Sequence, residues 1–194
     1  RAHDPEMRTV IFDSPGTYPP GAFGIREYCV FNLREGMTRP GQWYLDRDRG
    51  RVVYWPLANE HPERCRIEAA VTNVLLRIDG SEAAPVSGVS LRGLKFDLTG
   101  VNLSSSGWGA HPYDGAVQMT HVRNCRLEDL VVTRAGGQGI KITGADETIV
   151  DNCVITHCGA NGIVFNRGTR NAILNCRVKG VGEVYPSAVE IGRA

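Results

Sequence analysis

The hydrophobic positions of residues 116–184 repeat at a fixed step of 23 residues. Stretches 116–138, 139–161 and 162–184 overlay without a gap, and in each of them apolar and variable residues alternate as they do in a β-strand. The equivalent apolar positions form four columns: Val117, Ile140 and Ile163; Met119, Ile142 and Phe165; Leu130, Cys153 and Cys176; Val132, Ile155 and Val178. A step in the twenties built from short strands predicts a solenoid, in which each coil buries its apolar face against its neighbours.

The same alternation predicts which side chains face outward. If the apolar columns point into the solenoid, the residues between them point out, and successive coils stack about 4.8 Å apart. Glu190 joins this arrangement only through a three-residue slip at the turn of Tyr185 and Pro186. We therefore predict one outward column that consists of Arg77, Gln118, Lys141, Val164 and Glu190.

One long loop interrupts the repeat. The strand patterns at 89–96 match those at 125–132, but their offset is 36 residues, and the 13 extra residues lie within 98–115. A long loop inside a strict repeat is typical of a functional segment. Its aromatic and titratable residues are Trp108, His111, Tyr113 and Asp114.

The first part of the chain shows a different pattern. We predict that residues 1–70 hold an N-terminal strand, a Pro/Gly-rich connector and a small β-sandwich-like unit, and that residues 71–194 form the coils. The strands of the first part are expected at 8–12, 28–32, 42–45 and 51–55. Its core is expected to contain Trp43, Tyr44, Tyr54 and Trp55. Because the chain begins with Arg1 and stops just after a strand pattern, we expect a fragment whose last coils are missing.

Composition narrows the classes of partner. Lysine and arginine (22) nearly balance aspartate and glutamate (21), for a net charge of +1, so nothing indicates a nucleic-acid or acidic-membrane partner. No apolar run approaches the roughly 20 residues of a membrane span. The six cysteines include no CxxC pair. We favour stacked free thiols at Cys153 and Cys176, with a disulfide or metal site as the alternative.

A second column lies at the turns. Asp129, Asn152 and Asn175 follow one another at the 23-residue step. Such residues tolerate the left-handed turn conformation, and their side chains can hydrogen-bond from one coil to the next. We predict a structural stack here.

Two motifs carry a resemblance to a known family. The first is the segment 35–56, with a Pro-Gly-Gln-Trp-Tyr run and a Tyr-Trp-Pro ending; the second is the run of Gly-Ile-x-Ile and Asn-Cys-x-Val/Ile coils in 139–178. With these motifs the chain resembles right-handed parallel β-helix proteins, in particular β-helix glycoside hydrolases. The resemblance implies an all-β, right-handed parallel β-helix preceded by a small β unit, a carbohydrate substrate, and export to the periplasm or beyond the cell. No catalytic motif of that family can be matched to particular residues, and fold alone does not establish function.

The spacing of two carboxylates tests whether the chain could be a glycoside hydrolase. The two catalytic carboxyl groups lie about 5–5.5 Å apart in retaining glycoside hydrolases and about 6.5–9.5 Å apart in inverting ones. We predict Asp114 and Glu190 as catalytic candidates, but three coils, or about 14 Å, separate them, so each needs another partner. The predicted substrate-binding residues are Trp108, His111, Tyr113, Gln118 and Lys141. The structural alternatives are a turn cap for Asp114 and a packing role for the loop aromatics.

Two other functions stay open. A polysaccharide lyase on this fold would use Lys141 and would hold Ca²⁺ with Asp146, Glu147 and Asp151. A non-catalytic glycan-binding or surface solenoid would need neither. Apart from that possible Ca²⁺, we expect no metal and no cofactor.

Overall fold

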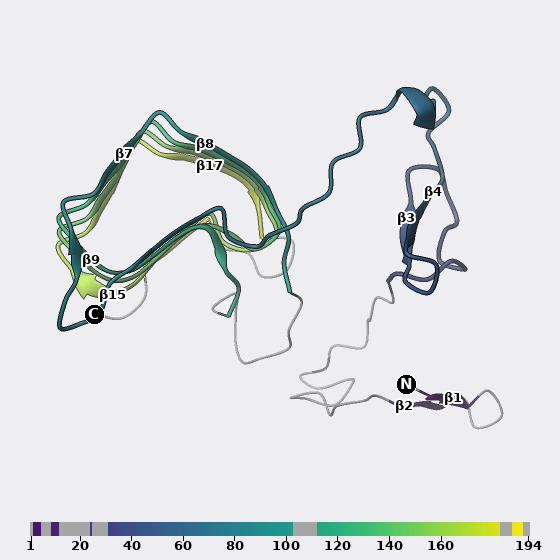
Figure 1. Cartoon of the computed structure of the whole chain (residues 1–194), viewed down its shortest axis with the longest axis horizontal. Helices are drawn as coiled ribbons and strands as arrows, with labels where there is room; N and C mark the ends of the chain where they lie inside the picture. The colour runs from purple at the N-terminus through teal and green to yellow at the C-terminus, as the bar shows by residue number, and fades with distance from the viewer. Residues whose placement is uncertain are drawn as a thin grey trace. The chain divides into compact units, whose positions relative to one another are not determined.

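The computed structural model describes residues 2–4, 9–11, 24, 31–102, 112–182 and 188–191. It divides the chain into two compact units, Arg1–Glu68 and Ala69–Ala194 (Figure 1). Within the described ranges there is no α-helix, and the single helical element longer than one residue is the 3-10 turn η2 (Pro62–Arg64). The fold class is therefore all-β, as the alternation predicts.

The first unit contains two antiparallel hairpins. Strand β1 (Ala2–Asp4) pairs with β2 (Thr9–Ile11), and β3 (Trp43–Asp46) pairs with β4 (Arg51–Tyr54). The carboxylate of Asp46 stabilises the second hairpin, because it accepts hydrogen bonds from the N–H of Arg49 at 3.3 Å and from Nε of Arg51 at 3.2 Å.

The predicted aromatic core of this unit is wrong for both tryptophans. Trp43 is 61% exposed and Trp55 is 43% exposed. A two-stranded hairpin has no second layer against which to bury them.

The expected strand at 28–32 is also not seen in its described part. Asn32 has a left-handed φ of 60°, and its side chain takes the place of strand pairing. It accepts a hydrogen bond from the N–H of Leu45 at 2.7 Å and donates to the carbonyl of Leu45 at 3.2 Å.

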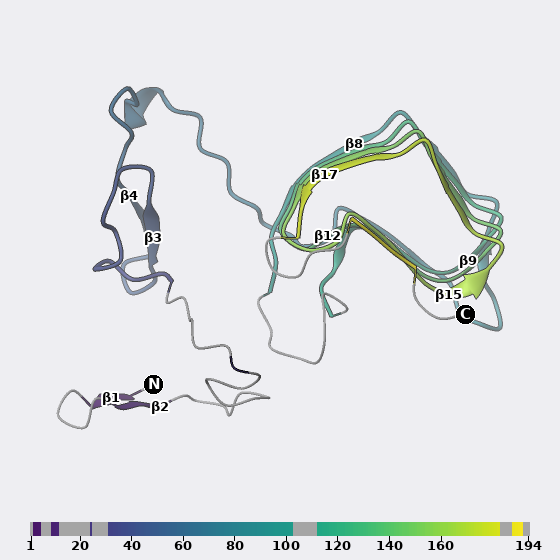
Figure 2. The same ribbon diagram turned by 180° about the vertical axis from the view of Figure 1, so that it is seen from behind.

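The second unit is a solenoid with three strands in each complete coil, and its coils lie one over another in both views (Figures 1 and 2). The first parallel sheet contains β5 (Leu76–Asp79), β9 (Gly115–Arg123), β12 (Gln138–Asp146), β15 (Ile163–Thr169) and β18 (Val189–Ile191), with β6 (Val86–Ser87) also paired to β9. The second contains β7 (Ser90–Arg92), β10 (Arg126–Glu128), β13 (Ile149–Asp151) and β16 (Ala172–Leu174). The third contains β8 (Lys95–Thr99), β11 (Val131–Ala135), β14 (Val154–Cys158) and β17 (Arg177–Val181).

The strand register confirms the predicted columns. Ile140 pairs with Val117 in one neighbouring strand and with Ile163 in the other. The 36-residue offset is confirmed by the pairing of Leu91 with Leu127. The three-residue slip is confirmed as well, because Ile163 pairs with Val189.

The interior is filled by the predicted apolar columns. Met119, Leu127, Ile142 and Ile155 are fully buried in one cluster that also contains Cys153. The cysteines that the structure describes are all free thiols, as favoured above. The thiol of Cys153 donates to the carbonyl of Leu127, at an Sγ–O distance of 3.6 Å.

Burial should protect the interior thiols from alkylation. It raises the pKa of Cys153 and of Cys158 to about 11, so few thiolates exist at neutral pH. At about pH 8 we expect iodoacetamide to modify exposed Cys65 quickly and to leave Cys153 and Cys158 unmodified until the protein is denatured. Peptide mass spectrometry reads out each site, and Cys65→Ser should remove the fast reaction at that peptide. Rapid native labelling of Cys153 would contradict the inward assignment.

The turn stack is confirmed in conformation and only partly in its bonding. Asp129, Asn152 and Asn175 have φ values of 56°, 51° and 52°. Asn152 donates to the carboxylate of Asp129 at 2.8 Å, as predicted. Asn175 instead donates to the carboxylate of Asp151 at 2.9 Å, because a charged acceptor lies one residue before Asn152.

Candidate functional site

The outward face of the first sheet carries the candidate site. Strand pairing places Arg77, Gln118, Lys141, Val164 and Glu190 in one column, as the alternation predicts. A second outward column lies two residues further along each strand and consists of Asp79, Thr120, Thr143 and Asn166.

Val164 breaks the exposed column. Its strand neighbours, Ile163 and Phe165, belong to the interior cluster, whereas Val164 faces outward and does not. Val164 is nevertheless only 2% exposed. Val164 therefore lies in the predicted outward column but is not exposed there. For Glu190 the description covers the backbone alone, so the exposed polar part of the column extends from Arg77 to Lys141.

Two carboxylates flank Arg77. Its Nη1 lies 3.8 Å from Oδ2 of Asp79, and its Nη2 lies 4.0 Å from Oδ1 of Asp114. The side chains of all three residues are between 40% and 49% exposed. Because both contacts end on one planar guanidinium, the two carboxyl oxygens lie within about 10 Å of each other.

Asp114 is held in place through its main chain. Its carbonyl accepts a hydrogen bond from the N–H of Gln138 at 2.8 Å, where β12 begins. Asp79 is positioned by β5, which pairs with β9 so that Asp79 lies beside Thr120. The two acids thus come from a strand end and a loop end that are 35 residues apart in sequence and share one guanidinium in space.

Sequence reasoning missed Asp79. It is not among the residues predicted for the site, although the alternation of Leu76, Arg77 and Ile78 already places Asp79 on the face of Arg77. The alternation thus predicts the outward position of Asp79. It does not predict the register of β5 against β9, which brings Asp79 to the loop that ends at Asp114.

Tyr113 is a packing residue in this structure. It is 8% exposed and packs with Ala160 and Val101. Little of its surface is open to a ligand, and its substrate-binding role stays a prediction. Trp108 and His111, the other two predicted loop residues, lie outside the described residues.

Gln118 and Lys141 bind the end of the long loop. The N–H of Gly115 donates to Oε1 of Gln118 at 3.2 Å. Nζ of Lys141 and Nε2 of Gln138 both donate to the carbonyl of Tyr113, at 3.0 and 2.9 Å. The side chains of Gln118 and Lys141 are half-buried, so each combines a structural contact with an outward position.

The coils of the second unit match a known protein family. Residues 87–188, which are more than half of the chain, match the family described as "Right handed beta helix region". The chain belongs to the right-handed β-helix family. No curated protein and no solved structure gives a significant match. Membership of this family is in keeping with a carbohydrate-active β-helix protein.

The acids at the turns of this β-helix are engaged between coils. The hydroxyl and the N–H of Thr169 donate to Asp146 at 2.8 and 3.0 Å and lower the pKa of that carboxyl. Nε of Arg170 donates to Glu147 at 2.9 Å, and Arg126 lies 3.5 Å from Asp151. In the part of the chain that is described, no group of three or more His, Cys, Asp or Glu side chains could hold a metal ion.

The third sheet of the β-helix has its own ion pair. Nε of Arg134 donates to Asp97 at 2.7 Å, and with Lys95 at 3.1 Å it lowers the pKa of Asp97 to about 2. Asp97 lies on β8, outside the first sheet, so this ionised pair links one coil to the next and is not part of the candidate site.

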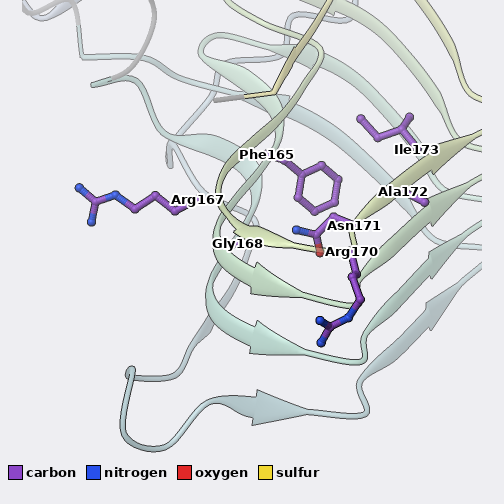
Figure 3. Close-up of a pocket in the computed structure, with 7 residues that line it drawn as sticks. All are labelled: Phe165, Arg167, Gly168, Arg170, Asn171, Ala172 and Ile173. Atoms are coloured by element: carbon purple, nitrogen blue, oxygen red, sulfur yellow. The ribbon is translucent and has the colours of Figure 1, made fainter. Parts of the chain in front are cut away.

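A cavity of about 180 Å³ lies where β15 leads into β16 (Figure 3). Phe165 and Ile173, which continue the interior columns, line it, whereas the guanidinium groups of Arg167 and Arg170 point away from the ring of Phe165 (Figure 3). Arg167 and Arg170 are exposed and Asn171, Ala172 and Ile173 are only partly buried, so the cavity opens at the surface beside β16, the last strand of the second sheet. Among the residues that the structure describes, no helix is long and apolar enough to cross a membrane.

Proposed function

We propose that the protein is a glycoside hydrolase-like β-helix and that Asp79 and Asp114 are its acid/base pair. The observation that carries the proposal is the pair of exposed carboxylates on Arg77, within about 10 Å of each other. That bound includes both spacings, about 5–5.5 and about 6.5–9.5 Å, at which hydrolases hold their two acids.

The roles follow from the chemistry of glycosidic bonds. One carboxyl group protonates the leaving oxygen, while the other activates water or attacks the anomeric carbon. Arg77 positions the two side chains, because both contact its guanidinium. We further propose that Gln118 and Thr120, the next outward residues on β9, hydrogen-bond sugar hydroxyls.

Asp79 replaces Glu190 as the proposed partner of Asp114. Glu190 pairs with Val164 in β15, and β15 is separated from β9 by β12. Glu190 is therefore three strand spacings from β9, about 14 Å, which exceeds the widest carboxylate spacing.

The test is hydrolysis of oligosaccharides by the full chain and its variants. We expect Asp79→Asn and Asp114→Asn each to lower kcat by at least about 100-fold, because each removes an acid/base group, while glycan binding persists. Glu190→Gln should retain activity. Glu128→Gln is the matched control, since Glu128 is an acid paired with an arginine, Arg126 at 2.8 Å, on the second sheet.

Other outcomes separate the alternative functions. Full activity in both aspartate variants would overturn the assignment. Unsaturated products and inactivation by a chelator would indicate the Ca²⁺-dependent lyase. Binding without any turnover would indicate a non-catalytic glycan-binding solenoid.

A further inference from the structure

The charges on the candidate face indicate the class of glycan, an inference that rests on the proposed function. The exposed part of the first column has two cations, Arg77 and Lys141. Arg77 contacts two carboxylates, at 3.8 and 4.0 Å. Nζ of Lys141 donates to the carbonyl of Tyr113 at 3.0 Å. Both cations are thus already engaged by groups of the protein.

An acidic sugar would meet this face at a disadvantage. A uronate carboxylate is recognised by charge-assisted hydrogen bonds from arginine or lysine. Here it would have to compete with Asp79 and Asp114 for Arg77, and it would add a third negative charge beside a single guanidinium. Like charges at such short range repel each other and disfavour the wrong partner.

The second outward column is neutral beyond Asp79. Thr120, Thr143 and Asn166 follow one another on β9, β12 and β15, and all three are partly exposed. Hydroxyl and amide groups both donate and accept hydrogen bonds, which matches the hydroxyl groups of a neutral sugar. The column runs across the stacked coils, so a linear chain laid along it would meet one such side chain about every 4.8 Å.

We infer that this face selects neutral glycans and excludes polyuronates. Asp79 and Asp114 then have a second role, because their negative charges lie beside the arginine that an acidic sugar would need. Removing their charges should therefore open the face to uronates, even as it abolishes hydrolysis.

Affinity electrophoresis of the full chain tests the inference. Native gels are cast with neutral polysaccharides (glucan, xylan, mannan and galactan) or with polyuronates (polygalacturonate and alginate). We expect at least one neutral gel to retard the protein and neither polyuronate gel to do so. The double variant Asp79→Asn/Asp114→Asn should gain polyuronate affinity by about tenfold or more, the effect of one freed charge-assisted contact. Glu128→Gln, which removes one of the two carboxylates beside Arg126 on the second sheet, should gain none.

The outcomes separate this inference from the proposed function. Retardation of the unaltered protein by polyuronate as strong as by any neutral gel would overturn the inference and leave the glycan-binding function standing. Retardation by no gel would overturn both. A double variant that binds neutral glycans and gains no polyuronate affinity would show that Arg77 is not the selecting group, which also contradicts the inference.

Discussion

Replacement of Gly168 with alanine is expected to lower the free energy of unfolding by more than about 3 kcal/mol. Gly168 lies in β15 with a φ of +115°, which L-residues rarely adopt. It pairs with Ala145 of β12, and an added Cβ would overlap the carbonyl oxygen of Ala145. The strand cannot move away without breaking its pairing to β12, so strain and clash add together.

Gly93→Ala is the matched control for this effect. Gly93 also has a positive φ, 68°, but an added Cβ would meet no atom within 4 Å. It should therefore cost only the left-handed backbone term, about 1 kcal/mol. Urea unfolding followed by circular dichroism measures both variants. Equal costs at the two glycines would show that the close approach of Ala145 is not what requires Gly168.

Much of the β-helix could be predicted, because one physical requirement repeats in every coil. A strand with one buried face must alternate apolar and polar residues, and a stacked coil must return to the same register. These two conditions place Ile140 between Val117 and Ile163, and the structure pairs them in that way. The small first unit has no such repeat, and there the expected burial of Trp43 was wrong.

The candidate site was only partly predictable, because it depends on contacts between segments that no repeat relates. Alternation places Arg77 outward but does not show that Asp79 and Asp114 share it, since the offset between β5 and β9 differs from the 23-residue step. It also cannot show that the end of the long loop binds Lys141 through the carbonyl of Tyr113. The polar column neighbours of Val164 predict exposure, whereas the continuous apolar run of Ile163, Val164 and Phe165 is the signal for its burial.

A cavity in the middle coil is expected to destabilise the solenoid more than the same cavity in an outer coil. Ile142 is fully buried in β12 and pairs with Met119 on one side and Phe165 on the other. Ile142→Ala should lower the free energy of unfolding by about 3 kcal/mol, through lost burial and the cavity that remains. Each coil of a solenoid is stabilised mainly by its neighbours, so the damage at β12 weakens two interfaces together.

Ile173→Ala provides the comparison, because the chemistry is identical and the position differs. Ile173 lies in β16, pairs with Val150 on one side, and is only partly buried. Its removal weakens one interface and leaves a cavity that is open to water, so we expect a cost of about 1 kcal/mol. Thr143→Ala, next to Ile142 but facing outward, should change stability by less than about 0.5 kcal/mol. Urea unfolding measures the free energy of unfolding of the three variants and so ranks their costs. If Ile173→Ala cost as much as Ile142→Ala, position along the stack would have no effect. That result would show that the coils do not stabilise one another through nearest-neighbour contacts alone.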